Sequence, residues 1–269
     1  MRSTNLLWKG VPIRHAAMIL FLLCLSVLAC AQTAEELVNK NVQARGGIVK
    51  IKSAKTRLTT GKVKGGGRRR ATVAGFKQMN MRADLVRQDV SMQGMTAIQA
   101  FDGSAGWQTQ PFRGRKEPVL MGEDDLRDLL LAADFDGPLV DYAAKGNTIE
   151  YLGHDLVDGD DALRLKVTLN NGDIIYDYLD PDTFIEIRKE IQQFIRGSVR
   201  DRVVGYGSYK PVDGVMYPFS ISQGPKNHPD AQTTTVRKME ANVTIDPADF
   251  ALPASLKTEE KKSGMVGVH

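Results

Sequence analysis

Apolar and polar residues alternate over most of the chain, and this period of two predicts β-strands. The clearest case is a hairpin. Residues 163–169 alternate, Asn171-Gly172 supply the turn, and Ile174, Tyr176 and Tyr178 return on one face. Strand follows strand through connections too short for helical crossovers, so the sheet is expected to be antiparallel. The predicted strands span residues 55–64, 71–81, 84–92, 95–101, 105–110, 163–169, 174–178, 184–195, 198–209, 215–222 and 232–244.

Two segments have helical spacing instead. Residues 33–45 present one apolar side and begin with a capping box formed by Thr33 and Glu36. Residues 122–145 start with an acidic first turn, break at Gly137-Pro138 and continue as a predicted second short helix. Helices inserted in a long sheet must cover one of its faces. The pattern therefore predicts an α+β fold that is mainly antiparallel β.

Residues 1–31 are predicted to be a secretory signal peptide. Three basic residues precede an apolar run over residues 16–28, and Ala29-Cys30-Ala31 has the small residues of a cleavage site. The run is about 13 residues long, whereas a membrane span needs roughly 20. A retained membrane anchor and lipidation at Cys30 are the alternatives. The sequence thus predicts a protein that works outside the cytoplasm.

Composition limits the chemistry of the exported chain. Removing the signal leaves 238 residues (269 minus 31), which we expect to form one domain over residues 32–256 and a disordered polar tail over residues 257–269. Both cysteines, Cys24 and Cys30, leave with the signal. Disulfides, thiol nucleophiles and cysteine-held metal clusters are therefore excluded from the mature domain.

Charge is distributed unevenly along the chain. Residues 32–100 carry 14 bases and 4 acids, and residues 101–269 carry 19 bases and 28 acids. Either the two parts neutralise each other within one fold, or the protein has a positive side that faces anionic lipid or a charged partner. The near-neutral total argues against nucleic acid. At a predicted hairpin tip, Arg68, Arg69 and Arg70 are candidates for contact with lipid head groups, with a solubilising loop as the alternative.

The sequence offers no catalytic or metal-binding constellation. His154 and His228 are not at ligand spacing, and the aspartates of residues 155–161 do not fit a calcium loop and read as a polar turn before a strand. A Gly-x-Ser-x-Gly elbow and a His-Glu-x-x-His helix are both missing from the sequence. We therefore expect no enzyme activity and no cofactor.

Flexible apolar side chains suggest a binding wall. Methionine is unbranched and polarizable, so methionines on strands can line a cavity that fits variable acyl chains. The same residues could equally form an ordinary core beneath the inserted helices. The predicted cavity residues are Met79, Met81, Met92, Met95, Phe101, Trp107, Leu126, Leu129, Leu130 and Tyr176.

Residues 178–185, 209–219 and 245–250 resemble segments of the outer-membrane lipoprotein-sorting family, the LolA/LolB-like proteins, and residues 101–107 are similar to its divergent relatives. The resemblance implies an incomplete antiparallel β-barrel wrapped around helices, with an apolar cavity between them. In the best-known members this cavity holds lipoprotein acyl chains in transit across the periplasm. The family has no catalytic residue to carry over.

The resemblance also implies an arginine that latches a helical lid, for which Arg57 and Arg82 are both candidates. The expected function is a monomeric periplasmic carrier that holds two or three acyl chains of a lipid or lipoprotein and exchanges them with inner- and outer-membrane proteins. The alternative is a sensing or scaffolding module of the envelope without cargo. An open cavity favours the first function and a filled one the second.

Overall fold

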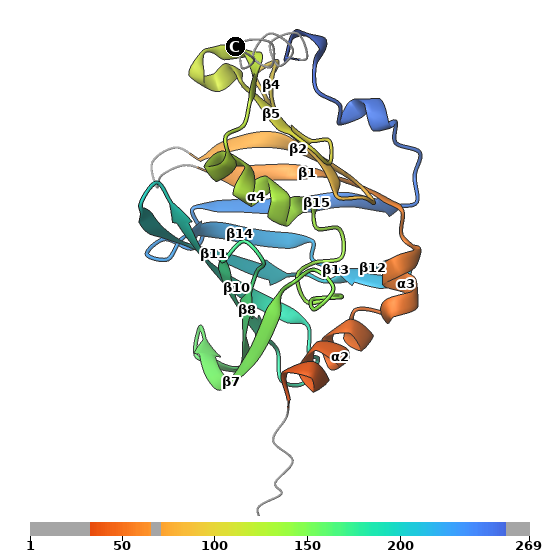
Figure 1. Cartoon of the computed structure of the whole chain (residues 1–269), viewed down its shortest axis with the longest axis vertical. Coiled ribbons are helices and arrows are strands. Elements are labelled where there is room, and N and C mark those ends of the chain that lie inside the picture. The colour runs from red at the N-terminus through yellow and green to blue at the C-terminus, as the bar shows by residue number, and fades with distance from the viewer. Residues whose placement is uncertain (1–32, 66–70, 257–269) are drawn as a thin grey trace, which may run out of the picture. The chain divides into compact units, whose positions relative to one another are not determined.

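The computed structural model describes residues 33–65 and 71–256, and those from Ala34 onward belong to one compact unit (Figure 1). The predicted signal peptide, the predicted head-group contacts at Arg68, Arg69 and Arg70, and the predicted disordered tail lie outside the described residues. Within the described ranges, no helix has the length and apolar character that crossing a membrane requires.

The described residues form an antiparallel sheet of 13 strands in the order β6-β5-β4-β3-β2-β1-β15-β14-β11-β10-β9-β8-β7. The two ends of this order do not pair, so the sheet is unclosed, as predicted. Its strands are β1 (Thr56–Gly65), β2 (Thr72–Met81), β3 (Leu85–Met92), β4 (Met95–Phe101), β5 (Gly106–Gln110), β6 (Arg115–Leu120), β7 (Thr148–Val157), β8 (Asp160–Thr168), β9 (Ile174–Leu179), β10 (Glu186–Ile195), β11 (Ser198–Gly207), β14 (Ser220–Pro225) and β15 (Gln232–Ala241). A separate two-stranded sheet pairs β12 (Lys210–Val212) with β13 (Val215–Tyr217).

Most predicted strands are confirmed, and the exceptions lie mainly at the sheet edges. The edge strands β6 and β7 were not predicted, because β6 contains Pro118 and exposes most of its side chains and β7 alternates between exposed and half-buried positions. The prediction of a polar turn over residues 155–161 is wrong, since Asp158-Gly159 alone separate β7 from β8. The predicted strand 215–222 is split between β13 and β14.

The helices α2 (Ala34–Ala44), α3 (Ile48–Ser53) and α4 (Glu123–Ala133) accompany the sheet, and the described residues end in a helical stretch over residues 254–256. Helix α2 was predicted, whereas the six-residue α3 was not. The second helix predicted within residues 122–145 is wrong, because residues 138–146 form turns. Gly137, with φ of 88°, ends the first segment, and Asp141, with φ of 51°, has a left-handed conformation that a continuous right-handed helix over these residues does not allow.

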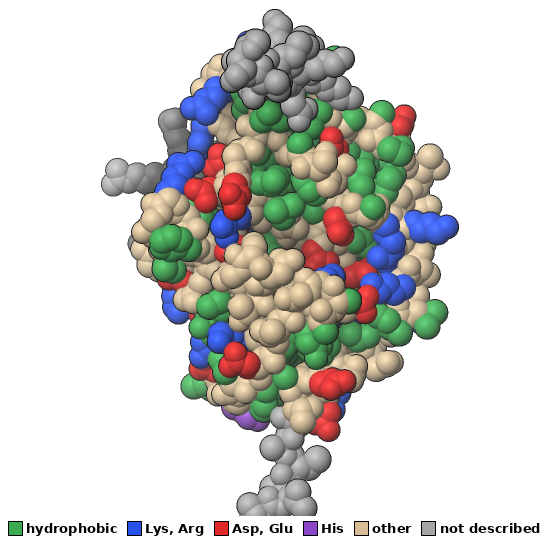
Figure 2. Space-filling view, in the orientation of Figure 1, with side chains coloured by type: hydrophobic (Ala, Val, Ile, Leu, Met, Phe, Trp, Pro, Cys, Tyr) green, Lys and Arg blue, Asp and Glu red, His purple; other side chains and the backbone are tan. Residues whose placement is uncertain are grey.

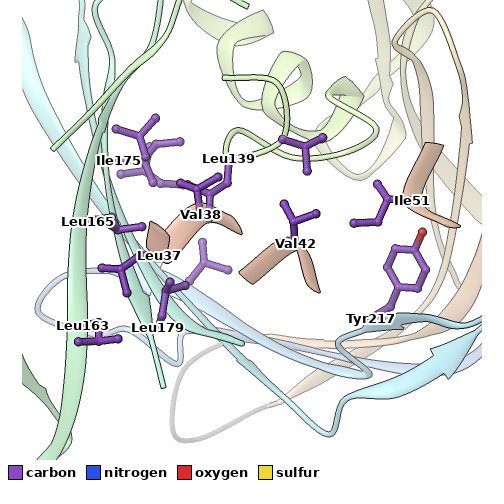
Figure 3. Packing of buried hydrophobic residues seen from close by; sticks show 14 of the residues in the cluster. Leu37, Val38, Val42, Ile51, Leu139, Leu163, Leu165, Ile175, Leu179 and Tyr217 are labelled. Carbon is purple, nitrogen blue, oxygen red and sulfur yellow. The ribbon is translucent and has the colours of Figure 1, made fainter. Parts of the chain in front are cut away.

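The main core lies between α2 and the strands β8 to β11 (Figure 3). Leu37 and Val38 of α2 meet Leu165 and Leu179 of the sheet, and Leu139 closes the cluster from the turn segment after α4. Each of these side chains is buried. The amphipathic stripe of α2 therefore supplies the contact that holds this end of the sheet, at about 2 kcal/mol for each large apolar side chain.

The opposite face of the sheet is covered by the C-terminal segment of residues 242–256. The indole Nε1 of Trp107 donates a hydrogen bond to the Phe250 carbonyl oxygen at 3.1 Å, and Phe250 is fully buried. Leu252 and Leu256 pack beside Trp107. Over β2 to β5 the sheet thus makes apolar contacts on both faces, with α4 on one side and residues 242–256 on the other.

Gly46→Ala is expected to destabilise the fold by about 2 kcal/mol. Gly46 has φ of 117°, and an added Cβ would lie 2.1 Å from the Gly214 carbonyl oxygen. Gly94→Ala is the matched control, since Gly94 also has positive φ but has no atom near its Cβ position. Thermal unfolding should show a larger loss for Gly46→Ala. Equal losses would mean that the backbone strain matters and the collision does not.

Candidate ligand pocket

Residues of α4 and of the sheet line a pocket of about 340 Å³. Helix α4 lies across this face of the sheet (Figure 1). Its apolar lining comes from strands far apart in sequence, from Leu131 and Ala132 of α4 and from Pro138 after the helix. Polar side chains, including Gln78, Gln88, Gln223 and Gln232, line the rest of it. The main apolar residues are Leu131, Ile175, Ile191, Val204, Ile221 and Met239. Figure 2 shows charged side chains interspersed among apolar ones on this side of the molecule.

Helix α4 is held over the pocket by apolar and polar contacts. Leu129 and Ala133 pack against Val86 and Phe101 of the sheet. Polar contacts join α4 to strands and to the β8–β9 turn, so the helix is held in a defined position. They are Asn80 Nδ2 to the Ala132 carbonyl (2.8 Å), Arg202 to Asp128 (2.9 Å) and Arg127 to Asp173 (2.6 Å).

The segment after α4 is fixed by Asp136, which is almost fully buried. Its carboxylate accepts two hydrogen bonds from the Arg82 guanidinium, each 2.9 Å long, and one of 2.8 Å from Lys52. Arg82 also donates to the carbonyls of Ile51 and Ala54 in and after α3. Arg82 therefore joins β2, α3 and the segment after α4.

Burial alone would raise the pKa of the Asp136 carboxyl, but the hydrogen bonds from Arg82 and Lys52 outweigh it and lower that pKa below its usual value. The aspartate is therefore charged at neutral pH, and its bonds have the strength of charge-assisted contacts.

A buried charge cluster lies at the base of the pocket. Lys189, which lines the pocket, has its Nζ 3.1 Å from Glu186 and 3.7 Å from Asp177. Burial opposes its charge, but the two carboxyls raise the pKa of Lys189 well above its usual value. Burial, followed by the charge of Glu186, raises the pKa of Asp177. The directions of these shifts favour Lys189 and Glu186 as the charged pair, and Asp177 keeps its proton to a higher pH than a free aspartate does.

None of the ten residues predicted to line a cavity lines this pocket. Met79 and Met81 lie on the other face of the sheet, where they pack with Ile245 and Phe250. Met92 and Met95 pair across the β3–β4 hairpin end. Met79 and Met81 belong to the outer layer, because alternation places Gln78 and not Met79 on the pocket face. Met92 and Met95 belong to a hairpin tip.

The other predicted cavity residues have structural positions. Phe101, Leu126 and Leu129 form the contact between α4 and the sheet, whereas Leu130 is exposed. Trp107 packs under the C-terminal segment. Tyr176 lies on the outer face, where the Arg164 guanidinium sits 4.4 Å from its ring centre.

His154 lies in β7, and its Nδ1 is 2.8 Å from an Asp161 carboxylate oxygen on β8. Across the described ranges, no three His, Cys, Asp or Glu side chains are grouped so that they could hold a metal ion.

The comparisons with known proteins identify the fold. No family model and no curated protein matches the chain. A LolA superfamily protein from Nitrosomonas europaea has a TM-score of 0.58 and 11% identity, over 82% of this chain and 99% of that one. A DUF1329 family protein from Desulfovibrio piger has a TM-score of 0.57 and 11% identity, over 82% and 98%. A putative outer membrane lipoprotein-sorting protein domain from Vibrio parahaemolyticus has a TM-score of 0.54 and 9% identity, over 81% and 95%.

The chain therefore has a LolA-like fold. The resemblance noted in the sequence is confirmed at the level of the fold, and the low identities mark the chain as divergent.

Proposed function

We propose that this protein is a non-enzymatic carrier that holds an acyl chain of a lipid or lipoprotein in the pocket beneath α4. The observation that carries the proposal is the open volume between α4 and the sheet, in a fold shared with a lipoprotein-sorting domain. The apolar part of the lining can take a chain, and the polar part can face a head group. Its export to the periplasm, as the predicted signal peptide implies, is part of the same proposal.

The size of the pocket favours one acyl chain rather than two or three. A volume of about 340 Å³ is near the lower end for ligand pockets. Burying about ten methylenes at about 0.8 kcal/mol each contributes about 8 kcal/mol before the cost of association. We therefore expect a dissociation constant in the micromolar range or weaker. Such an affinity suits a carrier that must release its cargo.

Thr234→Trp is expected to lower acyl-chain affinity at least tenfold, because a large side chain at this buried position would fill the pocket. Thr235→Trp is the matched control, since Thr235 is exposed and follows Thr234 on β15. Saturable binding of a fluorescent fatty acid measures the affinity, and native mass spectrometry after incubation with bacterial phospholipids identifies bound species. A wild-type protein that binds no acyl species in either experiment would contradict the proposed function.

The mode of export can be tested separately. The intact mass of the protein purified from its native cell distinguishes an N-terminus at Gln32 from a diacylglyceryl adduct on Cys30. The first result identifies a soluble periplasmic carrier and the second a tethered one.

A further inference from the structure

One cation in the pocket lacks a counter-charge. The Arg57 guanidinium lies 5.1 Å from the ring centres of both Phe135 and Tyr217, and it donates one hydrogen bond of 3.3 Å to Asn80 Oδ1. Both rings are buried. Among the described residues, no carboxylate lies within ion-pair distance of this guanidinium. The aromatic contacts position the group and leave N–H donors available.

The neighbouring cations, unlike Arg57, each have a carboxylate as counter-charge. Arg82 lies over the same Phe135 ring at 4.8 Å, but Asp136 binds its guanidinium through two hydrogen bonds. Two further cations line the pocket within the described ranges, and both are paired: Lys189 with Glu186 and Arg202 with Asp128.

Asp134 lines the pocket and precedes Phe135 in the sequence, but its carboxylate is not free to pair with Arg57. Asp134 is paired with Lys145 at 2.5 Å. Of the described residues that line the pocket, Arg57 therefore carries the one uncompensated positive charge. A half-buried cation without a partner is costly, and a bound anion removes that cost.

We propose that Arg57 binds the anionic head, a carboxylate or a phosphate, of a single-chain amphiphile whose tail lies in the pocket. This inference rests on the proposed function and names its ligand class. The planar fork of an arginine matches both oxyanions and can bind either through two parallel hydrogen bonds. A lipoprotein presents neutral ester and amide groups where its acyl chains begin, and such groups would leave Arg57 without a counter-charge.

The test compares three ligands with the same tail: palmitate, hexadecyl phosphate and the neutral hexadecanol. Displacement of N-phenyl-1-naphthylamine from the purified protein gives their affinities. At least one anionic ligand should bind ten or more times more tightly than hexadecanol, and the tighter of the two identifies the head group. In Arg57→Met this ratio should fall below about threefold while the hexadecanol affinity stays within about threefold of the wild type.

Three further variants make the test specific. Arg237→Met removes an exposed arginine and should keep the ratio. Arg202→Met tests the paired arginine of the lining as the rival head-group site; because it also releases α4 from Asp128, its affinity ratio and not its absolute affinities is compared with the wild type. Arg57→Lys keeps the charge without the fork and should retain part of the ratio, which covers the case in which Arg57→Met does not fold.

The two proposals can fail separately. If all three ligands bind the wild type with equal affinity, Arg57 does not bind a charged head group, and the proposed carrier function is still supported. If none binds, the carrier function fails as well. A ratio that persists in Arg57→Met, or that collapses in Arg202→Met instead, would place the head group away from Arg57 and overturn the inference.

Discussion

Glu186→Gln is expected to lower the free energy of unfolding by about 3 kcal/mol at neutral pH, because it leaves a buried lysine without its nearest counter-charge. The Glu186 and Lys189 side chains are only 13% and 10% exposed, and their charged atoms lie 3.1 Å apart. The remaining partner, Asp177, is 3.7 Å from the ammonium, beyond good hydrogen-bond distance. Burial opposes the charge of Glu186, but Lys189 and Arg45 lower its pKa.

Asp177→Asn should change the free energy of unfolding in the opposite direction to Glu186→Gln. Burial, followed by the charge of Glu186, raises the pKa of Asp177 above the value of 3.8 that applies in the unfolded chain. Between that value and the raised folded pKa, the folded state holds a proton that the unfolded state has lost, so this group makes stability fall as the pH rises through this window. Asparagine resembles the protonated carboxyl and does not titrate. We therefore expect Asp177→Asn to match the wild type in acid and to equal or exceed its stability at neutral pH.

Urea denaturation followed by circular dichroism, repeated from about pH 3 to pH 8, measures both effects. Glu186 contributes its stabilisation above its unfolded pKa and loses it as the pH falls through the lower folded value. The Glu186→Gln deficit should therefore shrink in acid. If Asp177→Asn lost as much stability as Glu186→Gln at neutral pH, Asp177 would carry the charge and the assignment would be reversed.

The strands could be predicted because their signals are local. Asn171-Gly172 is sufficient to place a hairpin, and it joins β8 to β9 as expected. The edge strands β6 and β7 lack such a strong signal, because β6 contains Pro118 and exposes most of its side chains, and the inward positions of β7 are mostly only half-buried. The extra helix after Pro138 was predicted from apolar residues that fold as turns, because Asp141 adopts a left-handed conformation in the middle of this segment.

The pocket residues could not be predicted, because long-range pairing decides which face of a strand is the inner one. In β2, Gln78 lines the pocket and Met79 faces outward, although the alternation alone allows either arrangement. Residues 242–256 make the Met79 face the outer, covered one, and this segment is more than 160 positions from Met79 in the sequence. The sequence does not mark the glutamines of the lining as pocket residues, because polar residues on strands usually face solvent.

The two latch candidates could not be separated by sequence either. Both arginines lie beside Phe135, yet Arg82 is bound to Asp136 and Arg57 faces the pocket. Of the two, Arg82 makes the contacts that a latch requires, since it ties the segment after α4 to α3 and β2. We therefore propose that the Arg82–Asp136 pair restrains α4, and that Arg57 has a different role.

Asp136→Asn is expected to loosen the segment after α4 and to lower the free energy of unfolding by about 2 kcal/mol. It removes the counter-charge of Arg82 and Lys52, whose side chains are 30% and 39% exposed, so solvent screening reduces the loss below that of a fully buried pair. Amide hydrogen exchange over residues 123–147 should quicken at least tenfold. Acyl-chain release should quicken with it, because α4 covers the pocket through this segment.

The control and the pH dependence separate this pair from a surface contact. Asp141 also pairs with Lys52 but is 47% exposed, so Asp141→Asn should cost less than about 1 kcal/mol and leave exchange nearly unchanged. Because the folded pKa of Asp136 is lowered, its stabilisation is present above the unfolded value of 3.8 and disappears as the pH falls through the folded pKa. Wild type and Asp136→Asn should therefore converge in acid. Unchanged exchange in Asp136→Asn at neutral pH would mean that the contacts of α4 with Asn80, Arg202 and Asp173 hold the helix without the Arg82–Asp136 pair.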